Sequence, residues 1–159
     1  VEPPIVKPQA PAAERPAPVA DEPAKPKRKL SAQGIRFRVN SEQIDFTDPA
    51  TRSIMDEMLE YMTQSCDDLQ VLIEGHASVD GPAKRNQELS VLRAREVAKW
   101  LVENGVPDEK IKGAVGYGSS MPRVPDPPPA AIKRMTKQQL EAIREQNRRI
   151  ELSVLRDCE

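Results

Sequence analysis

The sequence of 159 residues has little of several features that mark common classes of function. Aromatic residues make up 3% of it and the formal net charge is −1, so no strong basic field is available to hold nucleic acid. No apolar run approaches the length of a bilayer-spanning helix, so any membrane anchor would have to lie outside this sequence. No signal peptide is visible, and the chain begins with Val rather than Met, which predicts a mature or excised fragment.

Residues suited to catalysis or metal binding are also scarce. His76 is the only histidine, and no Cys, Asp or Glu cluster stands near it at the spacing of metal ligands, which predicts a loop-packing residue rather than a ligand. Ser78 and Ser90 lack the glycine-framed turn of a nucleophile elbow, and there is no second histidine for acid–base chemistry. The sequence therefore predicts a protein that is not an enzyme and that uses no metal or cofactor.

Residues 1–33 are predicted to be a Pro-rich disordered linker. Eight of the sixteen prolines fall within residues 1–30, mixed with Ala, Lys and Glu, and almost nothing there can form a core. Such a segment favours extended polyproline II at ~3.1 Å per residue, which gives a reach on the order of 90 Å. Two interpretations stay open: an inert end of the chain, or a tether that holds a folded domain away from a membrane anchor.

Alternating strand and helix patterns predict an α/β domain over residues 34–157. We expect strands at residues 35–39, 69–77, 111–117 and 149–154, with helices that begin near residues 49, 82 and 136. The order of the first five elements implies two right-handed crossovers and a mainly parallel sheet. The predicted fold is a two-layer βαβαβ(α)β sandwich with helices on one face of a small mixed four-stranded sheet. Residues 119–147 are predicted to add an extended Pro-rich loop and an extra helix.

Two separated motifs within this domain resemble those of a known family. The first follows the order G-H-x-x-x-x-G-x-x-x-x-N-x-x-L-S-x-x-R-A, and the second is N-R-R-I-E at residues 147–151. The first is met by Gly75, His76, Gly81, Asn86, Leu89, Ser90, Arg93 and Ala94. Over about residues 34–156 the chain resembles the OmpA-like C-terminal domain, the peptidoglycan-associated module of outer-membrane proteins, lipoproteins and flagellar stators.

The resemblance implies a ligand and the residues that bind it. The family recognises the diaminopimelate of a peptidoglycan stem peptide, and the Arg of its L-S-x-x-R-A motif, here Arg93, grips a carboxylate with its planar donors. The family's H-T-D reads His76-Ala77-Ser78 in this chain, so a hydroxyl replaces the acid that normally meets the ligand's amine. Asp80 is the nearby carboxylate in this loop that can substitute for it.

The candidate ligand-binding set follows from these positions. It consists of Arg93, Asn86, Ser78, Asp80, Ala77, Leu89 and Arg148. Arg93 is alternatively a structural partner of the loop, and Asn86 either caps loop backbone groups or contacts the ligand. Of Arg148 and Arg149, one is expected to face the pocket and the other solvent.

The two cysteines suggest one covalent link. Cys66 precedes the second predicted strand and Cys158 follows the fourth, without the spacing of a metal site or a C-x-x-C redox motif. If those strands are antiparallel neighbours, the thiols come together, and an oxidising periplasm would join them in a disulfide.

The sequence thus predicts a non-catalytic cell-wall-binding module on a Pro-rich tether. Its expected place is the periplasm of a Gram-negative bacterium, in association with the outer membrane, and its expected partner is peptidoglycan. The alternative is a protein-interaction scaffold that keeps the OmpA-like fold but has lost wall binding. Ser78 in the acidic position favours that alternative, and residues 119–147 are where another envelope protein would dock.

Overall fold

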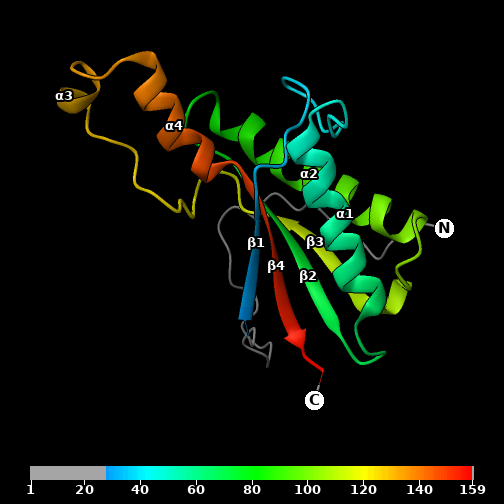
Figure 1. Ribbon diagram of the computed structural model, residues 1–159. Helices are drawn as coiled ribbons and strands as arrows, with labels where there is room; N and C mark the ends of the chain where they lie inside the picture. The colour runs from blue at the N-terminus through cyan, green and yellow to red at the C-terminus, as the bar shows by residue number, and fades with distance from the viewer. Residues whose placement is uncertain (1–27, 159) are drawn as a thin grey trace.

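The computed structural model describes residues 28–158, which form one sheet and a layer of helices (Figure 1). In chain order the elements are β1 (Arg28–Gln33), α1 (Pro49–Gln64), β2 (Gln70–His76), α2 (Ala83–Glu103), the 3-10 turn η3 (Asp108–Lys110), β3 (Ile111–Gly116), α3 (Pro129–Ile132), α4 (Lys137–Asn147) and β4 (Arg149–Arg156). The mixed α/β class agrees with the sequence prediction. Within residues 28–158, no helix is both long and apolar enough to cross a membrane.

The last strand lies inside the sheet. The strand order is β1-β4-β2-β3, with β4 antiparallel to both β1 and β2 and with β3 parallel to β2. The prediction of a mainly parallel sheet is therefore wrong in its pairing. Three strands do point the same way, but β4 separates β1 from β2, so β2–β3 is the one parallel pair of neighbours. Sequence order alone carries no information about such an insertion.

The first strand differs from the prediction. It is β1, Arg28–Gln33, rather than residues 35–39, so it lies within the range predicted as linker. The rest of that range, residues 1–27, lies outside the described residues. Residues 35–39 instead form a loop in which Ile35 is 6% exposed and Phe37 makes an isolated bridge to Ile44, while Val39 is 94% exposed. Apolar alternation in this loop thus imitates the period of a half-buried strand.

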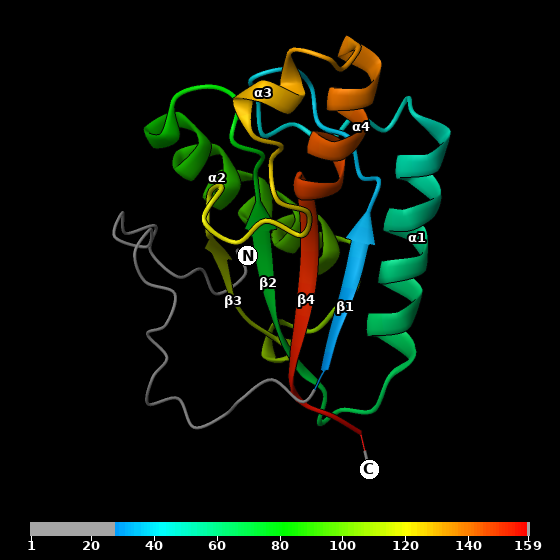
Figure 2. The same ribbon diagram turned by 90° about the vertical axis from the view of Figure 1, so that its left-hand side faces the viewer.

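The core fills the space between the sheet and the helices α1 and α2. Figure 1 shows both helices on one side of the sheet, and Figure 2 faces its other side. Apolar residues from both layers are buried there; fully buried examples are Met55, Met62, Val71, Ile73, Val97, Leu101, Ile111 and Val154. Asp48 caps α1 by accepting a hydrogen bond from the Thr51 N–H at 3.0 Å.

Helix α2 approaches the sheet unusually closely at its N-terminal half. A Cβ at Gly75 would overlap the backbone carbonyl oxygen of Ser90, and one at Gly116 would overlap the backbone nitrogen of Val91. Only glycine leaves room for this approach. The contact fixes the height of α2 above β2, and with it the position of every side chain that α2 presents to the loop after β2.

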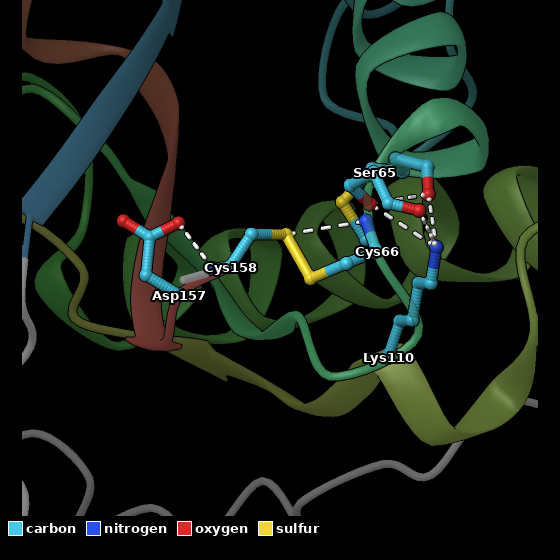
Figure 3. The surroundings of a disulfide bond; sticks show 6 residues. Ser65, Cys66, Lys110, Asp157 and Cys158 are labelled. Carbon is cyan, nitrogen blue, oxygen red and sulfur yellow. Dashed lines mark hydrogen bonds between the residues drawn. A yellow bond between two sulfur atoms is a disulfide. The ribbon is translucent and has the colours of Figure 1, made fainter.

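A disulfide joins Cys66 to Cys158, with their Cα atoms 5.7 Å apart (Figure 3). The predicted pairing is present because β2 and β4 are antiparallel neighbours. Next to it, the buried Lys110 ammonium donates to the Met62 carbonyl at 2.8 Å and to the Ser65 carbonyl at 3.1 Å. The bond and Lys110 together hold the end of α1, the start of β2 and the segment after β4.

Residues 119–147, between β3 and β4, are held in place by their own hydrogen bonds. Thr136 and Gln139 make the capping box that begins α4. The buried Asn147 side chain accepts from the N–H groups of Arg123 and Val124 at 2.7 and 2.9 Å and donates to the Val124 carbonyl at 2.8 Å. Figure 2 shows the segment after β3 crossing in front of β2 and β4. The three bonds of Asn147 therefore anchor the loop at the point where α4 passes into β4.

Candidate ligand-binding cleft

A cleft of about 630 Å³ opens where the loops at one end of the sheet meet. Its walls are the segment after β1, the loop after β2, the first turns of α2 and the junction of α4 with β4. All seven residues of the predicted set line it: Ala77, Ser78, Asp80, Asn86, Leu89, Arg93 and Arg148. The fold brings them together from three separate parts of the chain. Their role in ligand binding stays a prediction.

Arg93 is held in the cleft by contacts that leave its charge unneutralised. Its Nε donates to the Ser41 carbonyl at 2.8 Å, and its guanidinium carbon lies 4.9 Å from the centre of the Phe37 ring. Burial, followed by repulsion from Arg148 and Arg85, lowers the pKa of Arg93 from its ordinary value. Among the described residues no carboxylate pairs with it. The loop after β1 thus orients Arg93, which is the alternative that the sequence left open, while the rest of its guanidinium remains available.

The loop after β2 is shaped by Asn86. The Asn86 amide donates to the carbonyls of Ser78 and Asp80, both at 3.0 Å. Gly81 has a φ of +91°, a conformation that glycine adopts without strain. Asn86 therefore caps backbone groups of this loop and sets its shape. Below it, Ala77 and Leu89 form an apolar floor, each 7% exposed.

Arg148 is already paired on the other side of the cleft. It forms two hydrogen bonds with Glu141, at 2.6 and 3.0 Å, and lies 3.5 Å from Asp80. Its Nε also donates to the Ser78 hydroxyl at 3.1 Å, and Ser78 in turn contacts the Asp80 carboxylate. The hydrogen bond to Glu141 raises the pKa of Arg148. The cleft therefore contains two arginines in different states. The Arg148 guanidinium is paired with carboxylates, whereas the Arg93 guanidinium on the opposite side has no carboxylate partner among the described residues.

The same network lowers the pKa of two carboxylates. The hydrogen bond from Arg148 lowers the pKa of Glu141. Partial burial raises the pKa of Asp80, but the Ser78 hydroxyl and Arg148 outweigh it, so the net shift is downward. A carboxyl group with a lowered folded pKa stabilises the fold above its unfolded pKa, about 4. This contribution is lost as the pH falls through the folded pKa.

Acid is therefore expected to destabilise the wild-type chain more than an Arg148→Met variant between pH 6 and 3. The variant lacks the charge that lowers both pKa values, so it has less to lose. Urea unfolding at each pH measures the difference. Arg134→Met, which removes an exposed arginine, serves as control and should follow the wild type. Parallel curves for wild type and Arg148→Met would contradict the network.

One of Arg148 and Arg149 was expected to face the cleft and the other solvent, but Arg149 does not face solvent. Its side chain is buried, and its Nε lies 2.5 Å from Glu151 while its Nη2 donates to the Met121 carbonyl at 3.0 Å. Arg148 precedes β4 and lines the cleft, while Arg149, the first residue of β4, lies with Glu151 on the face of the sheet that α1 and α2 leave open. Sequence reasoning also missed a buried group of Glu74, His76 and Glu151 on this face, because Glu151 is far from the other two along the chain.

Residues 36–136 match the OmpA family, and they make up more than half of the chain. The chain belongs to the OmpA family. The resemblance noted in its motifs is thereby confirmed.

Two relatives of this OmpA-family chain are outer-membrane proteins by name. It is 39% identical over 84 residues to outer membrane porin F of Pseudomonas fluorescens, covering 53% of this chain and 22% of the porin. It is 38% identical over 87 residues to outer membrane protein A of Serratia odorifera, covering 55% of this chain and 35% of that protein. The matched region thus spans well under half the length of either relative.

Solved structures share the fold. The periplasmic domain of Helicobacter pylori MotB superimposes with a TM-score of 0.59 at 20% identity, covering 82% of this chain and 75% of that one. The peptidoglycan-associated lipoprotein of Burkholderia pseudomallei gives a TM-score of 0.54 at 22% identity, covering 80% and 90%. At these identities the likeness establishes the fold of the OmpA-family domain.

Proposed function

We propose that this OmpA-family domain is a non-catalytic peptidoglycan-binding module that anchors a bacterial envelope protein to the cell wall. Its ligand is the diaminopimelate of a stem peptide, which presents both carboxylate and ammonium groups. The proposal places the chain in the periplasm of a Gram-negative bacterium, in association with the outer membrane. The Pro-rich segment before β1 would act as the spacer between the wall-bound domain and its anchor.

The main support for the proposal is that the half-buried Arg93 guanidinium has no carboxylate partner among the described residues. A half-buried guanidinium costs free energy unless an anion or several acceptors satisfy it. The Nε of Arg93 donates to the Ser41 carbonyl and its guanidinium packs on the Phe37 ring, so the position of Arg93 is fixed before any ligand binds. A carboxylate matches its remaining donors in a planar, two-bond geometry. The repulsion that Arg93 already feels from Arg148 and Arg85 would also be relieved by an anion.

The opposite wall suits the ammonium end of the same ligand. The Asp80 side chain is 44% exposed and bears a charge that Arg148, at 3.5 Å, only partly offsets. Ser78 holds this carboxylate toward the cleft through its hydroxyl. Asp80 therefore takes over the role of the acid that Ser78 replaces in the motif. A zwitterionic ligand would place its carboxylate at Arg93 and its amine at Asp80.

Co-sedimentation with purified diaminopimelate-type peptidoglycan tests the proposal. The wild type should pellet, and Arg93→Met, which keeps an unbranched side chain over Phe37, should bind about 10- to 100-fold more weakly, as expected for loss of charge-assisted hydrogen bonds. Lys99→Ala removes an exposed positive charge from the same helix and should pellet like the wild type. Asp80→Asn should weaken binding as well, and free diaminopimelate should compete.

A wild-type protein that stays in the supernatant would reject wall binding. The second candidate, a protein-interaction scaffold, would then take precedence. Residues 119–147 favour it, since Asn147 and the 2.8 Å pair between Arg144 and Asp126 hold this segment in a defined shape. A shape held by its own contacts can present a docking surface without the cost of ordering it on binding.

A further inference from the structure

The face of the sheet that α1 and α2 leave open carries a buried polar group. Glu74 and His76 alternate along β2 with Ile73, which points into the core, and Glu151 lies opposite Glu74 on β4. The exposed fractions of Glu74, His76 and Glu151 are 3%, 4% and 9%. One oxygen or nitrogen atom from each lies within 4.8 Å of the other two. Burying two carboxylates beside an imidazole is costly unless positive charge accompanies them.

The carboxylates are oriented toward the histidine. His76 Nε2 lies 3.9 Å from Glu74 Oε1 and 3.8 Å from Glu151 Oε1. The second oxygen of each carboxylate has its own donor: Ser153 Oγ lies 2.7 Å from Glu74 Oε2, and Arg149 Nε lies 2.5 Å from Glu151 Oε2. This is the outer-shell arrangement that orients carboxylate ligands around a metal ion.

His76 itself points to a ligand. Neither of its ring nitrogens has a hydrogen-bond partner among the described residues, although its side chain is 1% exposed. A buried polar atom left without a partner destabilises the fold. The ring stacks on Tyr117, with 5.4 Å between ring centres, which fixes its plane. Its Nε2 faces the two carboxylates, so a bound cation would give that nitrogen a partner.

We propose that Glu74, His76 and Glu151 form a binding site for a divalent transition metal, with Zn²⁺ as the ion that suits it. Imidazole nitrogen and carboxylate oxygen are both zinc ligands, at about 2.0–2.2 Å from the ion. Ligand atoms around tetrahedral zinc lie about 3.4 Å apart, so His76 Nε2, at 3.9 and 3.8 Å from the two oxygens, needs to approach each of them by about half an ångström. A water molecule or an added ligand completes the coordination.

The site would fasten β2 to β4 directly before the loop that lines the cleft. His76 is the last residue of β2 and is followed by Ala77 and Ser78. Zinc binding would thus fix the base of this loop from the opposite face of the sheet. The inference does not depend on wall binding, because none of the three proposed metal ligands belongs to the set of residues proposed to bind peptidoglycan.

Zinc titration of the chelator-treated, tag-free chain tests the site. The chain offers a simple background, since His76 is its only histidine and both cysteines are in the disulfide. Isothermal titration against a competing chelator should give one Zn²⁺ per chain. His76→Gln should weaken the affinity at least tenfold. Glu57→Gln, which removes an exposed carboxylate on α1, should leave it unchanged.

Two further readouts separate coordination from a change in folding. Co²⁺ in place of Zn²⁺ should produce the visible absorption of a four-coordinate site in the wild type and not in His76→Gln. Glu74→Gln provides a second variant that keeps the imidazole and should also bind at least tenfold more weakly. Absence of stoichiometric Zn²⁺ binding by the wild type would overturn the proposal, as would equal affinity in wild type, His76→Gln and Glu74→Gln.

Discussion

Replacing Cys66 and Cys158 with serine is expected to lower the free energy of unfolding by about 4–5 kcal/mol. The bond spans 92 residues of sequence, and closing so long a loop removes much of the conformational freedom of the unfolded chain. The change should be measured by urea unfolding, with the fluorescence of Trp100, the only tryptophan, as the probe.

Reduction supplies the matched control. Wild-type protein treated with a reducing agent should unfold at the urea concentration of the double serine variant, and the agent should not move the midpoint of that variant. The single variant Cys158→Ser should behave like the double one, because either change opens the same loop. A difference between wild type and double variant below about 1 kcal/mol would contradict a stabilising role for this bond.

The disulfide and α2 show what local patterns can predict. Cys66 and Cys158 flank two strands, so a single assumption, that the strands are antiparallel neighbours, was enough to pair them. Helix α2 can be predicted from the sequence because its apolar residues repeat at the helical period between Pro82 and Gly105. The helix rests on a pattern that neighbouring residues encode by themselves, whereas the disulfide also needed the assumed pairing of two distant strands.

The first strand and the position of β4 show what local patterns cannot predict. Residues 35–39 alternate because a loop buries Ile35 and half-buries Phe37, and periodicity cannot distinguish this from a strand. The insertion of β4 between β1 and β2 depends on pairing between distant segments. The same long-range pairing brings Glu151 beside Glu74, which is why the buried polar group on the open face could not be found from spacing.

The candidate cleft lies between these cases. Arg93, Asn86 and Ser78 could be named from the motif, since a helix that begins beside a loop must face it. The contact of Arg148 with the loop after β2 could not, because Ser78 lies 70 residues away along the chain and only the fold brings its hydroxyl within 3.1 Å of Arg148. The chemistry of a cleft arginine depends on whether it is paired, and its pairing depends on tertiary contacts.

Gly75→Ala is expected to lower the free energy of unfolding by about 3 kcal/mol. Alanine for glycine within a strand normally stabilises, because it reduces the freedom of the unfolded chain. Here the added methyl group would overlap the backbone carbonyl oxygen of Ser90, so α2 must move away from the sheet, and overpacking of this kind destabilises. The sign of the effect therefore separates close helix–strand contact from simple backbone freedom. Urea unfolding measures it.

The identity of the clashing atom gives the sharper test. Ala94 Cβ would lie 3.4 Å from the new methyl group, so a side-chain clash would be relieved by adding Ala94→Gly. A backbone clash would not, and the double variant should be less stable than Gly75→Ala by a further ~1 kcal/mol, the cost of glycine within a helix. Recovery of stability in the double variant would contradict the contact. Helix α2 carries Asn86 and Arg93. Its displacement in Gly75→Ala should therefore also weaken the binding of any ligand in the cleft, because both side chains would move with the helix.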